Sequence, residues 1–202
     1  LVAVTGPILG AVADIRGLKK KLFKFCLLIG VFGCAVLGFV PSWFFFLVIF
    51  ILTNTGYSAS LIFYDAMLTD VTKPKRMDTV SSQGFAWGYI GSCIPFTIGL
   101  SFVLSASKSG ISFQTAMTLA FVITAFWWLL TTLPLLKAYQ QRYYVEKTEK
   151  MVLNSLKRLT NTIKDVCRNK KVFTFLLAYF FYIDGVFTVI DMATAYGQAL
   201  GL

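Results

Sequence analysis

The chain has 202 residues, of which 57% are hydrophobic and only 14% charged, and its formal net charge is +10. Soluble globular domains carry about 25% charged residues, so this composition excludes an ordinary soluble domain. The four cysteines form no CxxC pair and His is absent, so the sequence indicates neither a metal site nor a disulfide framework. Apolar runs of about 18 residues or more, the length that spans a bilayer, recur along the chain. We therefore expect an all-α polytopic membrane protein without cofactor or metal.

The apolar runs predict six membrane helices, the first of them truncated. We place them at about residues 1–13, 22–40, 43–68, 82–105, 114–136 and 172–200. The chain begins LVAVTGPILG, without Met, and ends on QALGL directly after an apolar run. We therefore interpret it as a piece of a longer protein.

Basic residues gather in alternate connections between these helices. Segments 14–24, 69–80 and 137–171 hold five, three and ten of the 19 Lys and Arg, and Lys108 is the remaining one. The positive-inside rule places these three segments in the cytoplasm. The net positive charge then reflects which loops face the cytoplasm. Nucleic-acid binding would need a basic soluble face with interleaved aromatic residues, and we predict none.

Segment 137–171 is the one long polar stretch. An apolar stripe at helical spacing runs through it: Leu153, Leu156, Leu159, Ile163 and Val166. This pattern predicts an amphipathic helix, which either lies at the cytoplasmic membrane interface or is an ordinary solvated linker helix. The expected organisation is the remainder of an N-terminal six-helix half (1–136), a basic cytoplasmic linker (137–171) and the first helix of a second half (172–202).

The first basic loop resembles a loop motif of the major facilitator superfamily, whose members join two six-helix halves in this way. The superfamily pattern is G-x-x-x-D-R-x-G-R-K/R, and the loop here reads GAVADIRGLKK, with Ile15 and Leu18 in place of two arginines. The positions that match the pattern or keep the loop basic are Gly10, Asp14, Arg16, Gly17 and Lys19. The resemblance implies a cytoplasmic gate that latches this side of the protein during transport. A generic basic turn is the alternative interpretation.

Two longer stretches resemble one branch of this superfamily. Residues 63–92, FYDAMLTDVTKPKRMDTVSSQGFAWGYIGS, and residues 175–197, FLLAYFFYIDGVFTVIDMATAYG, are similar to patterns of the branch related to the yeast vacuolar amino-acid effluxer of autophagy. Asp65 stands where the branch usually has Asn, Thr69 replaces Pro, and Asp191 lies outside the shared pattern. The resemblance implies a permease in a cell membrane, or in the vacuolar membrane of a fungus, and amino-acid efflux as one activity.

Two carboxylates lie within the last apolar helix. Asp184 is about 12 residues after Val172, or roughly 18 Å along a helix and near mid-bilayer. An ionised carboxylate facing lipid there costs about 2.5–3.5 kcal/mol or more. We therefore expect Asp184 to face a cavity, where it contacts solute or carries a coupling proton; a structural hydrogen bond is the alternative. Asp191 shares its face near the outer end, as a cavity residue or as an interfacial acid.

The helix at 43–68 carries a polar stripe. Asn54, Ser58 and Asp65 fall within about 40° of one another on a helix, with Tyr57 beside them. Such a stripe faces the interior of a bundle, because polar groups avoid lipid. Asn54, Tyr57 and Ser58 are therefore candidates for the cavity, or for contacts that hold helices together. We expect Asp65, one turn from the cytoplasmic end, to be a gate or interface charge.

The helix at 82–105 is rich in small residues. Those with an expected role in helix packing, or as a hinge, are Gly84, Gly88, Gly91, Pro95 and Gly99. Small residues four apart allow helices to approach closely. Pro95 is tolerated where a neighbouring group satisfies the carbonyl that it frees.

These observations predict a secondary active transporter that moves a small solute across the lipid bilayer by alternating access. Protons are the candidate coupling ion. The alternative is a receptor or scaffold that uses the same fold without transport. No nucleophile motif or metal-ligand cluster indicates an enzyme.

Overall fold

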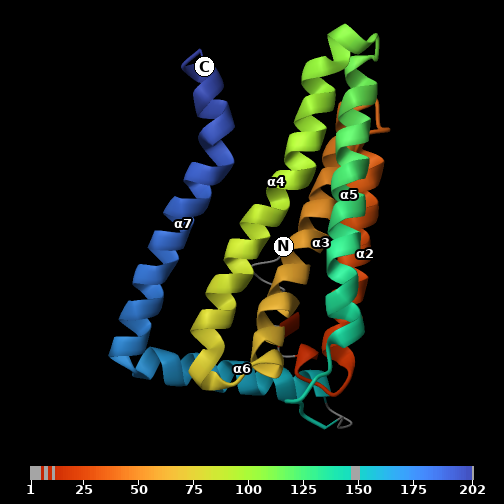
Figure 1. Ribbon diagram of the computed structural model, residues 1–202. Coiled ribbons are helices and arrows are strands. Elements are labelled where there is room, and N and C mark those ends of the chain that lie inside the picture. Colours follow the sequence, from red (N-terminus) through yellow and green to blue (C-terminus); the bar gives the residue numbers. More distant parts are fainter. Residues whose placement is uncertain (1–5, 7–8, 11, 147–150, 202) are drawn as a thin grey trace. The chain divides into compact units, whose positions relative to one another are not determined.

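The computed structural model describes residues 6, 9–10, 12–146 and 151–201, except for the side chains of residues 107, 151–156, 158–159, 191 and 194. Its helices are α2 (Leu18–Leu37), α3 (Trp43–Val71), the short 3₁₀ helix η1 (Pro74–Arg76), α4 (Met77–Ser109), α5 (Phe113–Ala138), α6 (Met151–Arg168) and α7 (Lys170–Ala199) (Figure 1). Residues 6, 9–10 and 12–13 are also helical. The described residues form no strand beyond an isolated bridge between Ile15 and Val145. The expected all-α fold is confirmed.

Four helices in the described part of the chain are long and apolar enough to cross a membrane. They cover Trp43–Val71, Pro74–Ala106, Phe113–Ala138 and Lys170–Ile190. The protein is therefore a multi-pass membrane protein. The expected span at 22–40 is not among the four, because α2 begins at Leu18 and carries four lysines in its first two turns. The expected span at 1–13 lies mostly outside the described residues, so the count of six stays a prediction.

The chain forms two compact units, residues 1–152 and residues 153–202. In the first unit, α2 packs against α3 and α5, α5 packs against α4, and α3 and α4 barely touch. In the second, a single residue, Asn169, separates α6 from α7.

Glycines in α2 and α3 let these helices approach closely. A β-carbon on Gly56 would lie 3.0 Å from the carbonyl oxygen of Cys26 and from the nitrogen of Gly30. One on Gly33 would collide with the side chain of Thr53, and one on Gly30 with the ring of Trp128 from α5. Small residues at such crossings are what brings backbones together in membrane bundles. They place α2 between its two neighbours.

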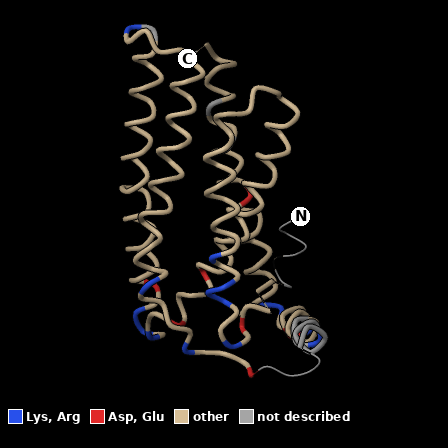
Figure 2. The backbone as a smooth tube through the Cα atoms, turned by 90° about the vertical axis from the view of Figure 1, so that its right-hand side faces the viewer, with Lys and Arg blue, Asp and Glu red and all other residues tan. Residues whose placement is uncertain are grey.

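Basic residues of the first unit gather mainly at one end (Figure 2). We call it the basic end; it holds the start of α2 and the connection from α3 to α4, with Lys73, Lys75 and Arg76. The buried hydrophobic core lies here too, formed by Ala13, Phe23, Leu27, Phe63, Met67 and Tyr139. Away from this core, large apolar side chains such as Phe32, Trp43 and Phe85 are exposed, which suits contact with lipid or with further helices.

Candidate functional site

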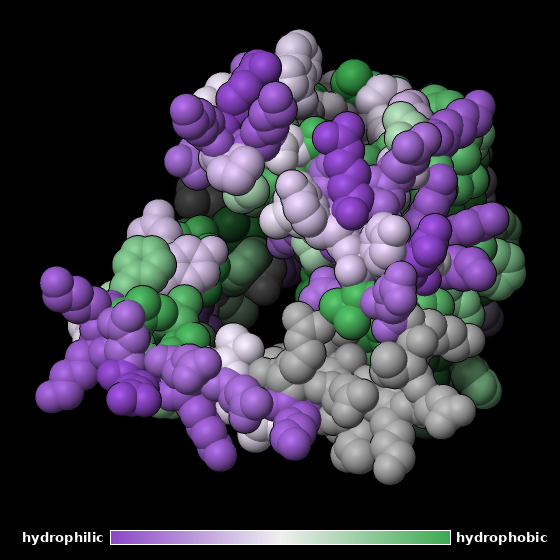
Figure 3. Space-filling view, turned by 90° about the horizontal axis from the view of Figure 1, so that it is seen from below, coloured by the Kyte–Doolittle hydropathy of each residue, from purple (hydrophilic) through white to green (hydrophobic). Residues whose placement is uncertain are grey.

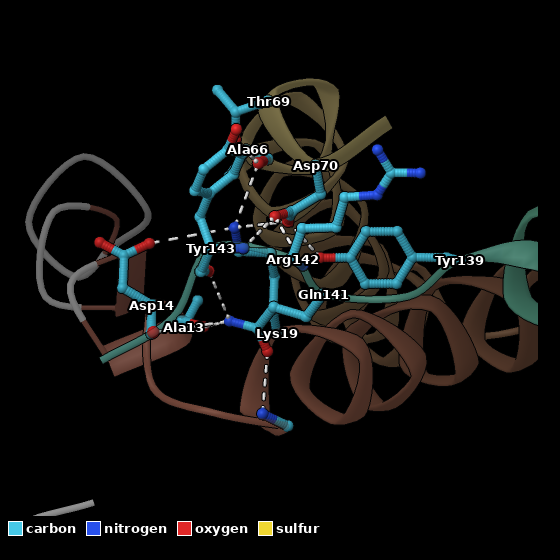
Figure 4. Close-up of polar contacts among 11 residues, drawn as sticks. Ala13, Asp14, Lys19, Ala66, Thr69, Asp70, Tyr139, Gln141, Arg142 and Tyr143 are labelled. Carbon is cyan, nitrogen blue, oxygen red and sulfur yellow. Dashed lines mark hydrogen bonds and ion pairs between the residues drawn. The ribbon is translucent and has the colours of Figure 1, made fainter. Parts of the chain in front are cut away.

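A buried carboxylate lies at the basic end. Asp70 is in the last turn of α3, and its side chain is fully buried. Four donors surround it (Figure 4). Oδ2 accepts hydrogen bonds from Lys19 Nζ at 3.0 Å and from the Tyr139 hydroxyl at 2.6 Å. Oδ1 accepts from the backbone nitrogens of Arg142 and Tyr143 at 3.0 and 2.9 Å. A buried charge with this many donors is well compensated.

The charge that balances Asp70 comes from the first turn of α2. The side chain of Lys19 is only 3% exposed, and Nζ also donates to the carbonyl oxygen of Ala66 at 3.2 Å. Asp14 lies 4.0 Å from the same Nζ, but its side chain is half exposed. The Lys19–Asp70 pair is therefore a buried ion pair, and removing either partner would leave an uncompensated charge.

The segment after α5 ties the first loop to this ion pair. Gln141 accepts a hydrogen bond from the Gly17 nitrogen at 2.8 Å and donates to the carbonyl oxygens of Ala13 and Asp14 at 3.3 and 3.5 Å. Val145 donates to the Asp14 carbonyl at 2.8 Å and accepts from the Arg16 nitrogen at 3.1 Å.

The guanidinium of Arg16 also lies 5.0 Å from the centre of the Tyr144 ring, within the range of a cation–π contact. We call Asp14, Lys19, Asp70, Tyr139 and Gln141, with the backbone of residues 142–145, the Asp70 cluster. It joins α2, α3 and the segment after α5.

Tyr139 is the neutral member of the Asp70 cluster. It follows directly on α5 and is 4% exposed. Burial, and then the hydrogen bond to Asp70, raise the pKa of the Tyr139 hydroxyl well above its usual range, because both disfavour a second negative charge. The hydroxyl therefore remains a donor to Asp70 at any physiological pH.

The structure brings four of the five expected gate residues together in or beside this cluster. Lys19, Asp14 and Arg16 make the contacts described above, and Gly17 has a φ of 75°, a conformation that favours glycine, at the start of α2. A β-carbon on Gly10 would meet no atom within 4 Å, so no close contact there requires glycine. Their role in gating stays a prediction.

Sequence reasoning missed the centre of this arrangement. Asp70 lies in the stretch 63–92, but the acid predicted there as a gate or interface charge was Asp65. Asp65 is exposed, whereas Asp70 is buried. Tyr139 and Gln141 were assigned to the basic cytoplasmic linker at 137–171, and the structure shows that they contact α3 and the first loop. A signal was present: Asp70 is one of only two acids in the basic segment 69–80.

The expected cavity residues divide between the two units. On α3, Asn54 and Tyr57 are exposed and Ser58 is half-buried, and the Tyr57 ring lies 5.6 Å from that of Trp128. On α7, Asp184 is exposed and its carbonyl accepts a hydrogen bond from Thr188. Because the two helices belong to different units, a shared cavity stays a prediction.

The side chain of Asp191 lies outside the described residues. Its expected place at the outer end of the cavity, or as an interfacial acid, therefore stays a prediction. Among the described residues, no three His, Cys, Asp or Glu side chains lie close enough to hold a metal ion.

The small residues of α4 differ in what they contact. Pro95 and Gly99 are buried, and a β-carbon on Gly99 would lie 3.1 Å from that of Ala120 in α5. Gly84 has the Tyr64 hydroxyl at 3.7 Å from such a position, while Gly88 and Gly91 have open space. In this unit, glycines allow close approach of helices at Gly99 and between α2 and α3. The role of the other α4 glycines as packing or hinge positions stays a prediction.

The chain is similar in sequence to a known protein family and to a curated relative. The sequence model of a family described as "Vacuole effluxer Atg22 like" matches residues 69–200. The chain is 48% identical over 206 residues to a protein of Bacillus subtilis (strain 168) named "Uncharacterized MFS-type transporter YxiO". This match covers all of the chain and 48% of the relative, so the chain spans about half the relative's length. No solved structure matches the chain.

Proposed function

This chain belongs to the vacuole effluxer Atg22-like family, and from that premise we propose that it forms part of a secondary transporter for a small solute. The observation that carries the proposal is the 48% identity, along the whole chain, to a protein named as an MFS-type transporter. The four apolar helices and the multi-pass character support it. In this proposal residues 1–136 belong to one half of the transporter, residues 137–171 form the linker, and residues 172–202 begin the second half.

The Asp70 cluster is the proposed latch of this transporter. The loop at residues 14–17 is held by Gln141 and Val145, while Lys19 behind it is fixed by Asp70. A transporter that alternates between two conformations needs contacts that hold one of them and then release. The concentration of basic residues at this end supports a cytoplasmic location for the latch.

Asp184 is the proposed contact for solute or for a coupling proton. It lies in a helix that spans the membrane, where a carboxylate is expensive unless it faces a cavity or a partner. Asn54, Tyr57 and Ser58 would line the same cavity, with Asp191 nearer its outer mouth. The resemblance to a vacuolar amino-acid effluxer makes amino acids the first solutes to test.

The test is flux of labelled amino acids through the full-length protein in liposomes, with and without a pH gradient. Asp184→Asn keeps the size of the side chain but cannot ionise, so we expect gradient-driven flux to fall at least about tenfold, the effect of losing about 1.4 kcal/mol. Asp165→Asn is the matched control, because Asp165 is an exposed carboxylate on α6. Its flux should equal that of the wild type.

Two results would contradict these assignments. Equal flux in Asp184→Asn and wild type, at both pH conditions, would remove Asp184 from the transport path. Absence of flux for every solute tested, by a protein shown to be folded, would favour a receptor or scaffold on the same fold.

A further inference from the structure

The second unit contains an apolar notch that has no role in the proposed transport function. It lies on the inner side of the elbow between α6 and α7, and its volume is about 410 Å³. Small-molecule sites typically measure roughly 300–1,000 Å³. Its walls include Ile163, Val166 and Cys167 from α6, and Phe173, Leu177 and Phe180 from α7. A notch lined in this way takes a hydrocarbon group.

The elbow places α6 at the level where α7 begins. Asn169 is the single residue between the helices, and its nitrogen donates to the carbonyl oxygens of Asp165 and Val166, both at 3.1 Å. Its carbonyl accepts from the Phe173 nitrogen at 2.9 Å, and its side chain accepts from the Val172 nitrogen at 3.4 Å. With no loop between them, the last turn of α6 lies beside the first turn of α7.

The notch extends from the membrane surface into the hydrocarbon. The span of α7 begins at Lys170, and two adjacent lysines there suit the headgroup level. Phe180 is ten residues further, or about 15 Å along the helix. The hydrocarbon core is about 30 Å thick, so Phe180 lies well inside it. A lipid chain is the apolar molecule that is always present at this depth.

Charged residues on α6 lie on a different side from the notch. At about 100° per residue, Lys164 and Arg168 lie about 100–140° around the helix from Ile163, while Asp165 lies about 160° away. All four side chains are exposed. With Ile163 toward the membrane, the long side chains of Lys164 and Arg168 extend to the headgroups, whereas the short side chain of Asp165 stays in water.

We propose that the elbow of α6 and α7 binds an anionic phospholipid. Its headgroup phosphate contacts Lys164 and Arg168, with Lys170 and Lys171 nearby, and one acyl chain occupies the notch. Figure 3 shows hydrophilic side chains gathered on the face seen from below, with hydrophobic ones between them. Residues 163–171 contain four basic side chains and one acidic one, which selects an anionic headgroup over a zwitterionic one. The proposal needs α7 to span the membrane and α6 to lie at the membrane surface, and it is independent of the solute.

The test measures lipid bound to the full-length protein by intact mass spectrometry, from micelles that contain equal amounts of phosphatidylglycerol and phosphatidylcholine. Wild-type protein should retain phosphatidylglycerol preferentially. Lys164→Glu with Arg168→Glu should reduce that preference at least about tenfold, since each basic residue near an anionic surface contributes about 1 kcal/mol. Lys73→Glu with Lys75→Glu makes the same change in charge at the exposed connection between α3 and α4, away from the notch, and it should change the preference less than about twofold.

A second variant tests the notch without changing charge. Cys167 is exposed and lines the notch, so Cys167→Trp should fill it and reduce the bound phosphatidylglycerol, while size-exclusion chromatography shows a folded protein. Equal retention of the two lipids by wild type, or unchanged preference in Lys164→Glu with Arg168→Glu, would overturn the proposal. The proposal would also be overturned if maleimide failed to label the Cys167 thiol after lipid is removed, because another protein segment would then fill the notch.

Discussion

The substitution Asp70→Asn removes one charge from the Asp70 cluster and keeps the shape of the side chain. An Asn side chain has one oxygen and one NH₂ group, whereas Asp70 has two oxygens that accept four hydrogen bonds. If the oxygen of Asn faces the backbone nitrogens of Arg142 and Tyr143, its NH₂ group faces Lys19 and Tyr139. The NH₂ group can only donate, so neither Lys19 nor Tyr139 would find an acceptor there.

The magnitude follows from the burial of Lys19. Its side chain is 3% exposed, and without Asp70 its near acceptors are the Ala66 carbonyl at 3.2 Å and the half-exposed Asp14 at 4.0 Å. Breaking a buried ion pair by removing one partner typically costs about 3–5 kcal/mol. We expect the free energy of unfolding to fall by that amount. Changing the pair together, by Lys19→Met with Asp70→Asn, removes both charges and keeps an acceptor for the backbone nitrogens of Arg142 and Tyr143, so it should cost less than Asp70→Asn alone.

Equilibrium unfolding of the full-length protein in mixed micelles, followed by tryptophan fluorescence, measures these differences. Glu146→Gln is the control, because Glu146 is an exposed acid close to the same segment, and its effect should stay within about 0.5 kcal/mol. A loss below about 1 kcal/mol for Asp70→Asn would refute the reasoning. So would a double variant that is less stable than Asp70→Asn, since the penalty would then not arise from the unpaired lysine.

Two further substitutions test other contacts by the same unfolding measurement. Tyr139→Phe removes the 2.6 Å hydrogen bond to Asp70 and should cost about 1.5–3 kcal/mol. Burial and Asp70 raise the pKa of Tyr139, so this cost should be equal at about pH 6 and pH 9. It should shrink only as the pH rises above the pKa of an unfolded tyrosine, about 10. A cost that differs between about pH 6 and pH 9 would contradict this expectation. Gly30→Ala should cost about 1–3 kcal/mol, because the new β-carbon collides with the Trp128 ring. Adding Trp128→Leu should recover part of that loss, and a strictly additive double variant would argue against the collision.

The helices were predicted well from the sequence, but their ends were not. Hydropathy locates the part of a helix that suits a bilayer, while polar residues continue the helix beyond it. Thus α3 continues to Val71 instead of ending near residue 68, and α4 begins at Met77 instead of near residue 82. The same reason explains α2, which begins with lysines at Leu18 although its apolar run begins later.

The Asp70 cluster was predicted only in part, because its contacts join distant parts of the chain. Lys19 and Asp70 are 51 residues apart, and Gly17 and Gln141 are 124 apart. Residues 14–19 could be assigned to a gate because they are contiguous and resemble a motif. Nothing in the local pattern of residues 139–145 indicates that they return to that loop, since this requires the close packing of α2 between α3 and α5.

Asp70 and Asp184 are both carboxylates in membrane helices, and their surroundings suit opposite roles. Asp70 is surrounded by four donors, one of them a buried cation, so every contact holds it in its ionised form. A proton carrier must instead alternate between its charged and neutral forms, which a saturated carboxylate resists. Asp184 is exposed in its unit and shows no side-chain hydrogen bond in the described part of the chain. A neutral Asp70 would leave the buried Lys19 without its counter-charge. For this reason we propose Asp70 as the fixed charge of the latch and Asp184 as the contact for solute or for a coupling proton, so Asp70→Asn should alter stability at neutral pH, whereas Asp184→Asn should alter the response of flux to a pH gradient.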